Sequence, residues 1–141
     1  MSSKPFKSTQ IAQTTTSKLW KLYQDVESWK NWDTEIEWSK LDGDFVEGGT
    51  GILKAKGSPQ LKFVITKIVQ DKRFEYQTNV PFGKLVVDHN FEQKDELVEF
   101  AHTVYFTGPL SGILDFALGR GFRKVLPSVL DNIKQILETK N

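Results

Sequence analysis

The feature that most constrains the fold of this 141-residue chain is a change of hydrophobic period near residue 110. Before it, apolar and polar residues alternate in six segments, as in strands with one buried face, and turn-rich stretches separate them. These segments are 35–41, 50–56, 61–69, 73–80, 83–93 and 97–107. After it, apolar residues recur every three or four positions to about Glu138, which predicts one long helix. The apolar stripe of that helix is Leu114, Leu118, Val125, Val129, Ile133 and Ile136.

The N-terminal part of the chain adds one strand and two short helices. Residues 5–13 alternate loosely, and a run of Thr and Ser able to cap a helix then precedes Leu19, Leu22, Tyr23 and Val26 at helical spacing. A second short helix is predicted in 27–33. The fold class is therefore α+β, a curved seven-stranded antiparallel sheet wrapped around the C-terminal helix, because the inner face of the sheet is the one large surface on which that helix can pack. The whole chain, 1–141, is read as one domain.

Composition excludes several classes of function. Nineteen basic residues against eighteen acidic ones give a net charge of +1, so no nucleic-acid partner is indicated. The absence of cysteine excludes disulfides, thiolate nucleophiles and cysteine metal sites. There is no signal-peptide pattern and no run of the roughly 20 apolar residues that a membrane span needs, so a cytoplasmic protein without stable membrane insertion is expected. Neither a cofactor nor a metal ion is predicted.

Three stretches, "IAQTTTSKLWKLYQDVESWKNWD", "LDGDFVEGGTG" and "LGRGFRKVLPSVLDNIKQILE", carry a family resemblance over nearly the full length. The chain resembles the START-like, Bet v 1-like (SRPBCC) superfamily with its helix-grip fold, and most closely the polyketide cyclase/dehydrase and lipid-transport branch. Trp20, Trp29 and Trp32 match the aromatic-rich helix pair, and the glycine turn "EGGTG" matches the turn between the next strands. The resemblance implies a cavity for hydrophobic ligands under the long helix, and it does not by itself imply catalysis.

The only two histidines of the chain lie in two consecutive predicted strands. In 84–92 the odd positions, including His89, form the apolar set, and in 97–106 the even positions, including His102, do so. Both imidazoles should therefore face the interior. A compact loop around 94–97 selects the register in which His89 opposes His102 and Phe91 opposes Phe100, and a slip by two residues still leaves the histidines within about 7 to 8 Å.

The chemistry of the histidine pair stays open at this stage. Zinc normally takes three or four ligands, and no third histidine or inward carboxylate is evident, since Asp88 falls on the outward set. As acid and base groups the imidazoles have a suitable intrinsic pKa near 6.5. Alternatively, two neutral imidazoles hydrogen-bond to each other, to hydroxyl groups or to water inside an apolar cavity.

The leading hypothesis is a binding or carrier protein for a small hydrophobic or amphipathic molecule, lipid-like or polyketide-like, held between sheet and helix. The predicted ligand-binding residues are Trp38, Phe63, Tyr76, Val87, His89, Phe91, Phe100, His102, Val104, Leu114, Leu118 and Gly121. The alternative is a cyclase or dehydratase in which His89, His102 and Tyr76 transfer protons. A monomer or weak homodimer is expected.

The glycines at 119 and 121 weaken the predicted long helix, since each costs about 0.5–1 kcal/mol in a helix interior. Two interpretations follow. Either the helix moves there to admit a ligand, or the glycines let a neighbouring strand approach closely.

Overall fold

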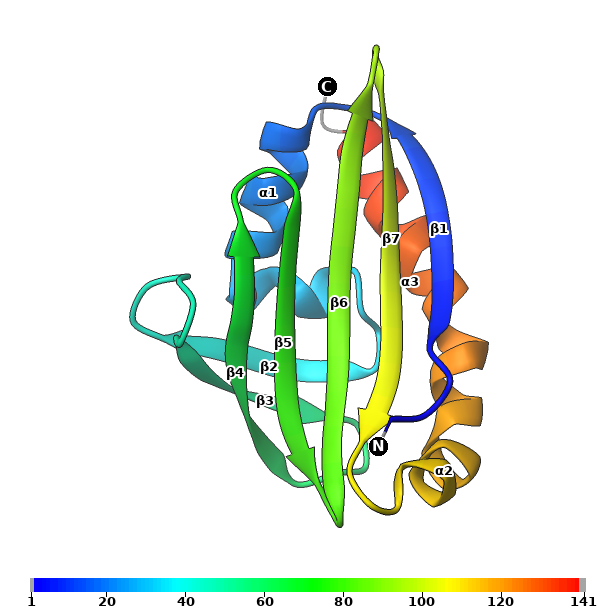
Figure 1. Ribbon diagram of the computed structural model, residues 1–141. Helices are drawn as coiled ribbons and strands as arrows, with labels where there is room; N and C mark the ends of the chain where they lie inside the picture. The colour runs from blue at the N-terminus through cyan, green and yellow to red at the C-terminus, as the bar shows by residue number, and fades with distance from the viewer. Residues whose placement is uncertain (1, 140–141) are drawn as a thin grey trace.

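The computed structural model, which describes residues 2–139, contains a seven-stranded antiparallel sheet curved around a C-terminal helix (Figure 1). The strand order is β1-β7-β6-β5-β4-β3-β2, so every sequential pair from β2 to β7 is a neighbouring pair, and β1 closes onto β7. The strands are β1 (Phe6–Gln13), β2 (Ile36–Asp42), β3 (Thr50–Ala55), β4 (Gln60–Val69), β5 (Arg73–Val80), β6 (Gly83–Lys94) and β7 (Leu97–Thr107). This arrangement confirms the predicted α+β class and helix-grip architecture.

The helices lie on the concave side of the sheet. After β1 come the α-helix α1 (Thr16–Gln24) and the 3₁₀ helix η1 (Val26–Asn31), and the C-terminal segment consists of α2 (Ser111–Leu114), the π-helical turn η2 (Asp115–Gly119) and α3 (Arg120–Thr139). Thr15 caps α1 by accepting a hydrogen bond from the backbone N–H of Lys18, as the Thr-rich run before the helix predicts. The long helix therefore covers one part of the concave face, and α1 with η1 covers the other.

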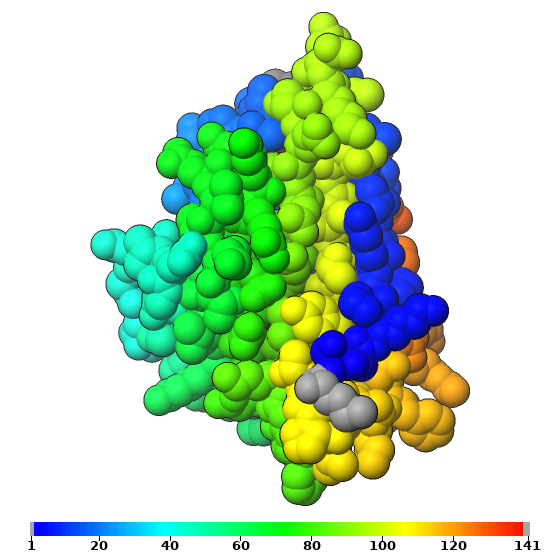
Figure 2. Space-filling view, viewed as in Figure 1, coloured from blue at the N-terminus to red at the C-terminus, as the bar shows by residue number. Residues whose placement is uncertain are grey.

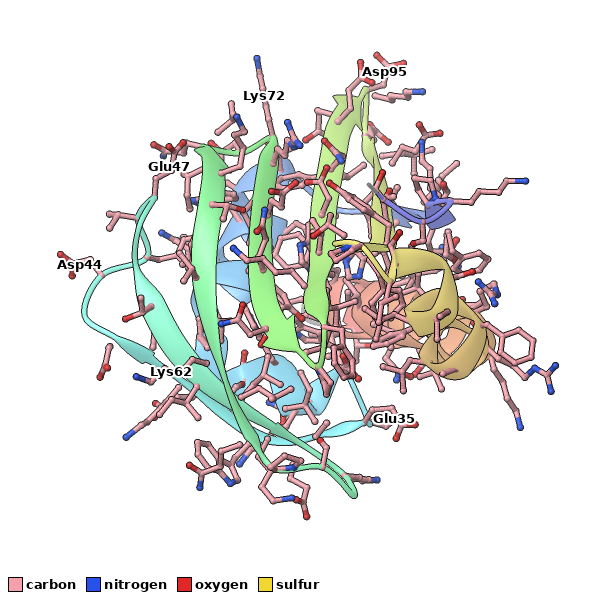
Figure 3. All side chains as sticks on the ribbon, turned by 60° about the horizontal axis from the view of Figure 1, so that its bottom comes forward. Glu35, Asp44, Glu47, Lys62, Lys72 and Asp95 are labelled. Atoms are coloured by element: carbon pink, nitrogen blue, oxygen red, sulfur yellow. The ribbon has the colours of Figure 1, made fainter. Side chains whose placement is uncertain are left out.

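The inner face of the sheet can be followed as rows of side chains that cross from strand to strand. One row contains Phe91 and Phe100, the next contains Phe74, His89 and His102, and the two beyond are Tyr76, Val87 and Val104, then Thr78, Leu85 and Phe106. All of these side chains are buried. The charged residues labelled in Figure 3, such as Lys72 and Asp95, point away from this interior.

A β-bulge in β2 changes which face of the sheet Trp38 occupies. The pairing of β2 with β3 shifts between Ile36 and Trp38, so the alternation restarts and Ser39 becomes the buried residue. The Ser39 hydroxyl donates a hydrogen bond to the carbonyl oxygen of Val26 in η1, at 2.6 Å. Trp38 is only partly buried, opposite Lys54, and it lies outside the hydrophobic core. The prediction that Trp38 lines the cavity was therefore wrong, because a bulge moves a side chain to the other face.

The π-helical turn η2 has a similar effect on the long helix. A π turn contains about one residue more than an α turn, so the inward-facing position after Leu114 falls on Gly119 and not on Leu118. Leu118 is 44% exposed, and Gly121 is exposed with open space where a Cβ atom would lie. Neither residue lines the concave face, which corrects both predictions. The buried residues that follow are Leu126, Val129, Leu130, Ile133 and Leu137.

Candidate functional site

Two histidines lie side by side on the concave face of the sheet. His89 of β6 pairs directly with His102 of β7, and Phe91 pairs with Phe100, which confirms the predicted register. The two imidazole rings are 4.4 Å apart between centroids and meet at 68°. Each histidine is 2% exposed, so the pair belongs to the interior of the protein.

Aromatic rings enclose the pair on several sides. The His89 ring stacks on Phe74, with centroids 3.8 Å apart and planes 7° from parallel, and the His102 ring contacts Trp32 edge to face. Tyr23 of α1 reaches both imidazoles, with ring centroids 5.3 and 5.8 Å away. Helix α1 therefore places its one tyrosine directly over the histidine pair.

Two hydrogen bonds fix the orientation of the imidazoles. Tyr23 Oη and His102 Nε2 share a hydrogen bond of 2.8 Å. His89 Nδ1 lies 3.1 Å from the carbonyl oxygen of Phe74, and because a carbonyl only accepts, His89 carries its proton on Nδ1. The other nitrogen of His89, Nε2, is then an acceptor in the neutral ring.

Burial keeps both imidazoles uncharged. Desolvation lowers the pKa of His89 to about 3, partly opposed by the hydrogen bond to Phe74. Burial also lowers the pKa of His102 well below its ordinary value, and the neighbouring His89 adds to this effect. Burial likewise raises the pKa of the Tyr23 hydroxyl well above 10. The cluster is a neutral one at physiological pH, and its histidines are weak bases.

Two nitrogens of the pair have no hydrogen-bonding partner within residues 2–139, namely His89 Nε2 and His102 Nδ1. In the same residues, the fully enclosed side-chain polar atoms that lack a partner are Thr14 Oγ1 and Trp32 Nε1. Both imidazoles are among the largest fully buried side chains of residues 2–139. The unpartnered acceptor at His89 Nε2, inside an otherwise apolar interior, is the chemical feature of the site.

The side chains of the concave face keep only small fractions of accessible surface. Tyr76, Leu85 and Val87 keep 7–8% of their surface accessible, and Leu114 on the facing helix keeps 7%. In contrast, Tyr23, Phe74 and Phe100 on the side of α1 are completely buried. Trp20 of α1 and Phe91 beside it keep 5–6% as well, so both halves of the concave face are closely packed.

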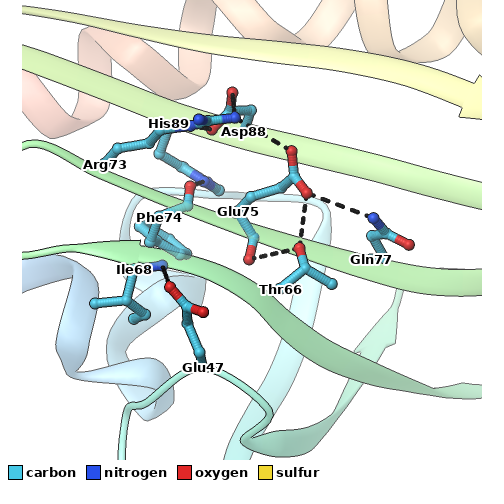
Figure 4. A network of polar contacts seen from close by, with 9 residues as sticks. All are labelled: Glu47, Thr66, Ile68, Arg73, Phe74, Glu75, Gln77, Asp88 and His89. Carbon is cyan, nitrogen blue, oxygen red and sulfur yellow. Dashed lines mark hydrogen bonds and ion pairs between the residues drawn. The ribbon is translucent and has the colours of Figure 1, made fainter.

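The opposite face of the same strands carries a charged network (Figure 4). Arg73 donates two hydrogen bonds of 3.0 Å to the Asp88 carboxylate, and Glu75 accepts one of 2.7 Å from the Thr66 hydroxyl. Asp88 therefore faces outward, as its position in the alternation predicts. Its carboxylate is held by Arg73 and takes no part in the histidine site.

A groove of about 840 Å³ lies among residues of this outer face near the β6–β7 turn. Its lining includes basic side chains such as Lys7 and Arg73 together with acidic ones such as Glu92 and Glu99. An open groove with charges of both signs does not suit an apolar ligand. The concave face remains the better candidate for such a ligand.

Asp33, next to the end of η1, is a titratable group that the sequence analysis missed. Burial raises the pKa of its carboxyl to about 6, although a hydrogen bond from the backbone N–H of Glu35 works in the opposite direction. Its charge also contributes to raising the pKa of Tyr76, which burial dominates. In the sequence, Asp33 was only the last residue of the short helix predicted in 27–33, and nothing in that pattern indicates a buried carboxyl.

Most of the predicted site residues are buried together in the interior of the protein. Phe63, Tyr76, Val87, Phe91, Phe100, Val104 and Leu114 are buried in the same core as the histidines. Tyr23 was recognised in the sequence only as part of a helical stripe, and its contact with His102 depends on how α1 packs over the sheet.

No three His, Cys, Asp or Glu side chains of residues 2–139 gather in a way able to hold a metal ion. Within the same range, no helix has the length and apolar character to cross a membrane.

The fold and the enclosed concave face define a helix-grip protein of the Bet v 1-like, SRPBCC class. Residues 6–138 match the family model described as polyketide cyclase / dehydrase and lipid transport, and the chain belongs to this family. Among curated proteins, no match to the chain was found.

Solved structures with the same fold include proteins from bacteria and plants. Protein MLL2253 from Mesorhizobium loti is 14% identical with a TM-score of 0.78, over 98% of this chain and 99% of that one. Ara h 8.0201 is 14% identical with a TM-score of 0.74, over 98% and 99%. Norcoclaurine synthase from Thalictrum flavum, in a structure with dopamine and hydroxybenzaldehyde, is 10% identical with a TM-score of 0.70, over 96% and 86%. At these identities the likeness concerns the fold.

Proposed function

We propose that the protein binds and carries a small hydrophobic or amphipathic molecule between the concave face of the sheet and the C-terminal helix. The observation that supports this most is the pair of unpartnered ring nitrogens, His89 Nε2 and His102 Nδ1, in an otherwise apolar interior. A buried polar atom without a partner costs free energy. A ligand that forms a hydrogen bond with such a nitrogen recovers that cost.

The ligand's apolar body would lie between the sheet and the start of the C-terminal helical segment. The side chains that would contact it are Leu85, Val87 and Val104 on the sheet and Leu114 and Leu126 on the helices. Burying an apolar ligand among these side chains is favourable by about 25 cal/mol for each Å² removed from water. The histidines then orient the ligand, and the apolar walls supply most of the affinity.

The first test is native mass spectrometry of the freshly purified protein, followed by extraction and identification of any bound small molecule. Stoichiometric recovery of a lipid-like or polyketide-like compound is the expected result. A second test uses the apolar dye 1-anilinonaphthalene-8-sulfonate and the variant Val87→Trp, which places a larger side chain on the concave face where the ligand would lie. Binding should fall at least tenfold, because the added ring occupies the ligand's volume.

The control variant for this test is Val64→Trp, since Val64 is 40% exposed on the outer face of β4. It should bind the dye as the unsubstituted protein does. A clean apo mass, together with equal dye binding by both variants, would contradict the carrier function.

The second candidate function is a cyclase- or dehydratase-type enzyme, and Asp33 is the observation that favours it. A carboxyl with a pKa of about 6 can both give and take a proton near neutral pH, which histidines with strongly lowered pKa values do poorly. If the extracted compound is turned over, Asp33→Asn should abolish turnover and leave binding intact. An Asp33→Asn variant with unchanged turnover would exclude this role of Asp33.

A further inference from the structure

One end of the molecule exposes an unusual amount of apolar surface. Ten large apolar side chains of residues 2–139 are substantially exposed, and half of them lie on α2, η2 and the two loops beside these elements. They are Phe82, Leu110, Ile113, Phe116 and Leu118. Ile113 is 63% and Phe116 is 85% exposed, and we call this group the apolar tip. Exposed apolar clusters of this kind commonly mark an interaction surface.

The exposed residues in the C-terminal part of the apolar tip include no charged or polar side chain. Every exposed residue between Pro109 and Leu118 is proline, glycine, alanine or a larger apolar residue. The buried residues of the same stretch, Ser111 and Leu114, already supply its contact with the core. The exposed side of α2 and η2 therefore has no packing partner within the described chain.

The β5–β6 turn places Phe82 next to the loop that precedes α2. A Cβ atom on Gly108 would lie 3.0 Å from the carbonyl oxygen of Phe82, so this turn and the loop before α2 are in contact. Phe82 has a φ of +66°, a left-handed conformation that is costly for a residue with a side chain, and its ring is 73% exposed. The segment 107–120 forms the lower right corner of the molecule in Figure 2.

Positive charge follows directly after the apolar residues. Residues 107–126 contain Asp115 and three basic residues, for a net charge of +2, while the whole chain has +1. Arg123 binds the Asp115 carboxylate at 3.0 Å, which neutralises that acidic group. Arg120 and Lys124 are exposed, and within residues 2–139 neither has an ion-pair partner. Four residues apart on a helix, these two cations project from the same side.

We propose that the apolar tip docks onto the surface of an anionic lipid bilayer. A short helical segment that presents bulky apolar side chains next to unpaired cations has the composition of an interfacial membrane anchor. Ile113 and Phe116 enter the boundary between headgroups and acyl chains, and Arg120 and Lys124 remain among the lipid phosphates. The charge pattern favours this occupant over a second copy of the chain, whose identical tip carries the same positive charge.

The test is co-sedimentation of the purified protein with phosphatidylcholine vesicles that contain either no phosphatidylglycerol or 30% of it. The unsubstituted protein is expected to bind the anionic vesicles more tightly and to be released by salt. The double variant Ile113→Ser/Phe116→Ser should bind at least tenfold more weakly, because two large apolar side chains no longer enter the bilayer. Arg120→Gln/Lys124→Gln should lose about fivefold per charge on anionic vesicles only.

The matched control is Val46→Ser/Val69→Ser, which removes two exposed apolar side chains outside the apolar tip. It should bind vesicles as the unsubstituted protein does. Absence of vesicle binding, or equal binding by the Ile113→Ser/Phe116→Ser variant, would overturn the proposal. So would a dimer in analytical ultracentrifugation that this variant abolishes without any vesicle binding. Dye binding measured in lipid-free buffer should be the same for all four proteins, so failure of the docking proposal can be distinguished from failure of the carrier function.

Discussion

Lowering the pH from 7 to 5 should destabilise this protein through its two buried histidines. In the unfolded chain an imidazole has a pKa near 6.5, whereas in the folded protein burial lowers the pKa of His89 to about 3 and that of His102 well below 6.5. Below pH 6.5 the unfolded state therefore binds protons that the folded state does not accept. Because stability rises with pH wherever the unfolded state binds more protons, it must fall as the solution is acidified.

The size of the effect follows from the same pKa values. Between pH 7 and pH 5 His89 alone should lower the free energy of unfolding by about 2 kcal/mol, and His102 should add to this loss because its pKa is lowered in the same direction. Asp33 acts in the opposite direction, since its folded pKa of about 6 lies above the unfolded value, and it recovers about 1 kcal/mol. The expected net loss is therefore more than about 1 kcal/mol, in a pH range above the titration of ordinary carboxylates.

Urea denaturation at pH 7, 6 and 5 measures this loss directly. The loss between pH 7 and 5 should be smaller by about 2 kcal/mol in His89→Gln and larger by about 1 kcal/mol in Asp33→Asn. Each variant is compared with itself at the two pH values, so a general change in stability does not affect the result. A loss below about 1 kcal/mol in the unsubstituted protein, or an unchanged loss in His89→Gln, would refute the reasoning.

Three further substitutions test the packing by urea denaturation at pH 7. Tyr23→Phe should cost about 1–3 kcal/mol of unfolding free energy, because His102 Nε2 loses its partner; an effect near zero would mean that another donor replaces the hydroxyl. Gly51→Ala should also destabilise by at least about 1 kcal/mol, since a Cβ atom there would overlap the ring of Phe63, and a neutral effect would contradict this close approach. Gly121→Ala, with open space around the new methyl group, should stabilise α3 by about 0.5–1 kcal/mol, and destabilisation would show that the helix needs the glycine.

The sequence predicted the sheet well because strand parity and turn length are local properties. The alternation in β6 and β7 placed His89 and His102 on one face, and the short turn between these strands left one compact register. The capped α1 helix and the long C-terminal helix were likewise visible as patterns of a few neighbouring residues. All of these elements are determined within hairpins or single helices.

The errors occurred where one extra residue interrupts a regular period. The bulge at Ile36 and Trp38 and the π turn before Gly119 each add a residue without a distinctive sequence, so counting by twos or by fours fails beyond them. The remaining part of the site depends on packing between elements distant in sequence. Tyr23 and His102 are 79 residues apart, and nothing in either segment indicates their hydrogen bond.

The histidine pair itself indicates recognition more than core filling. An apolar side chain of similar size at position 89 would remove the unpaired Nε2, and the surrounding rings of Phe74 and Tyr23 would accommodate it. His89→Leu should therefore leave the protein folded and remove an acceptor for a ligand hydroxyl.

The measurement that tests this is the ratio of affinities for 2-naphthol and 2-methylnaphthalene, which differ in one hydrogen-bond donor. If His89 Nε2 accepts that donor, the unsubstituted protein prefers 2-naphthol by about two- to tenfold and the variant does not. Equal ratios in the two proteins would leave the histidines as core residues, and the carrier function would then rest on apolar contacts alone.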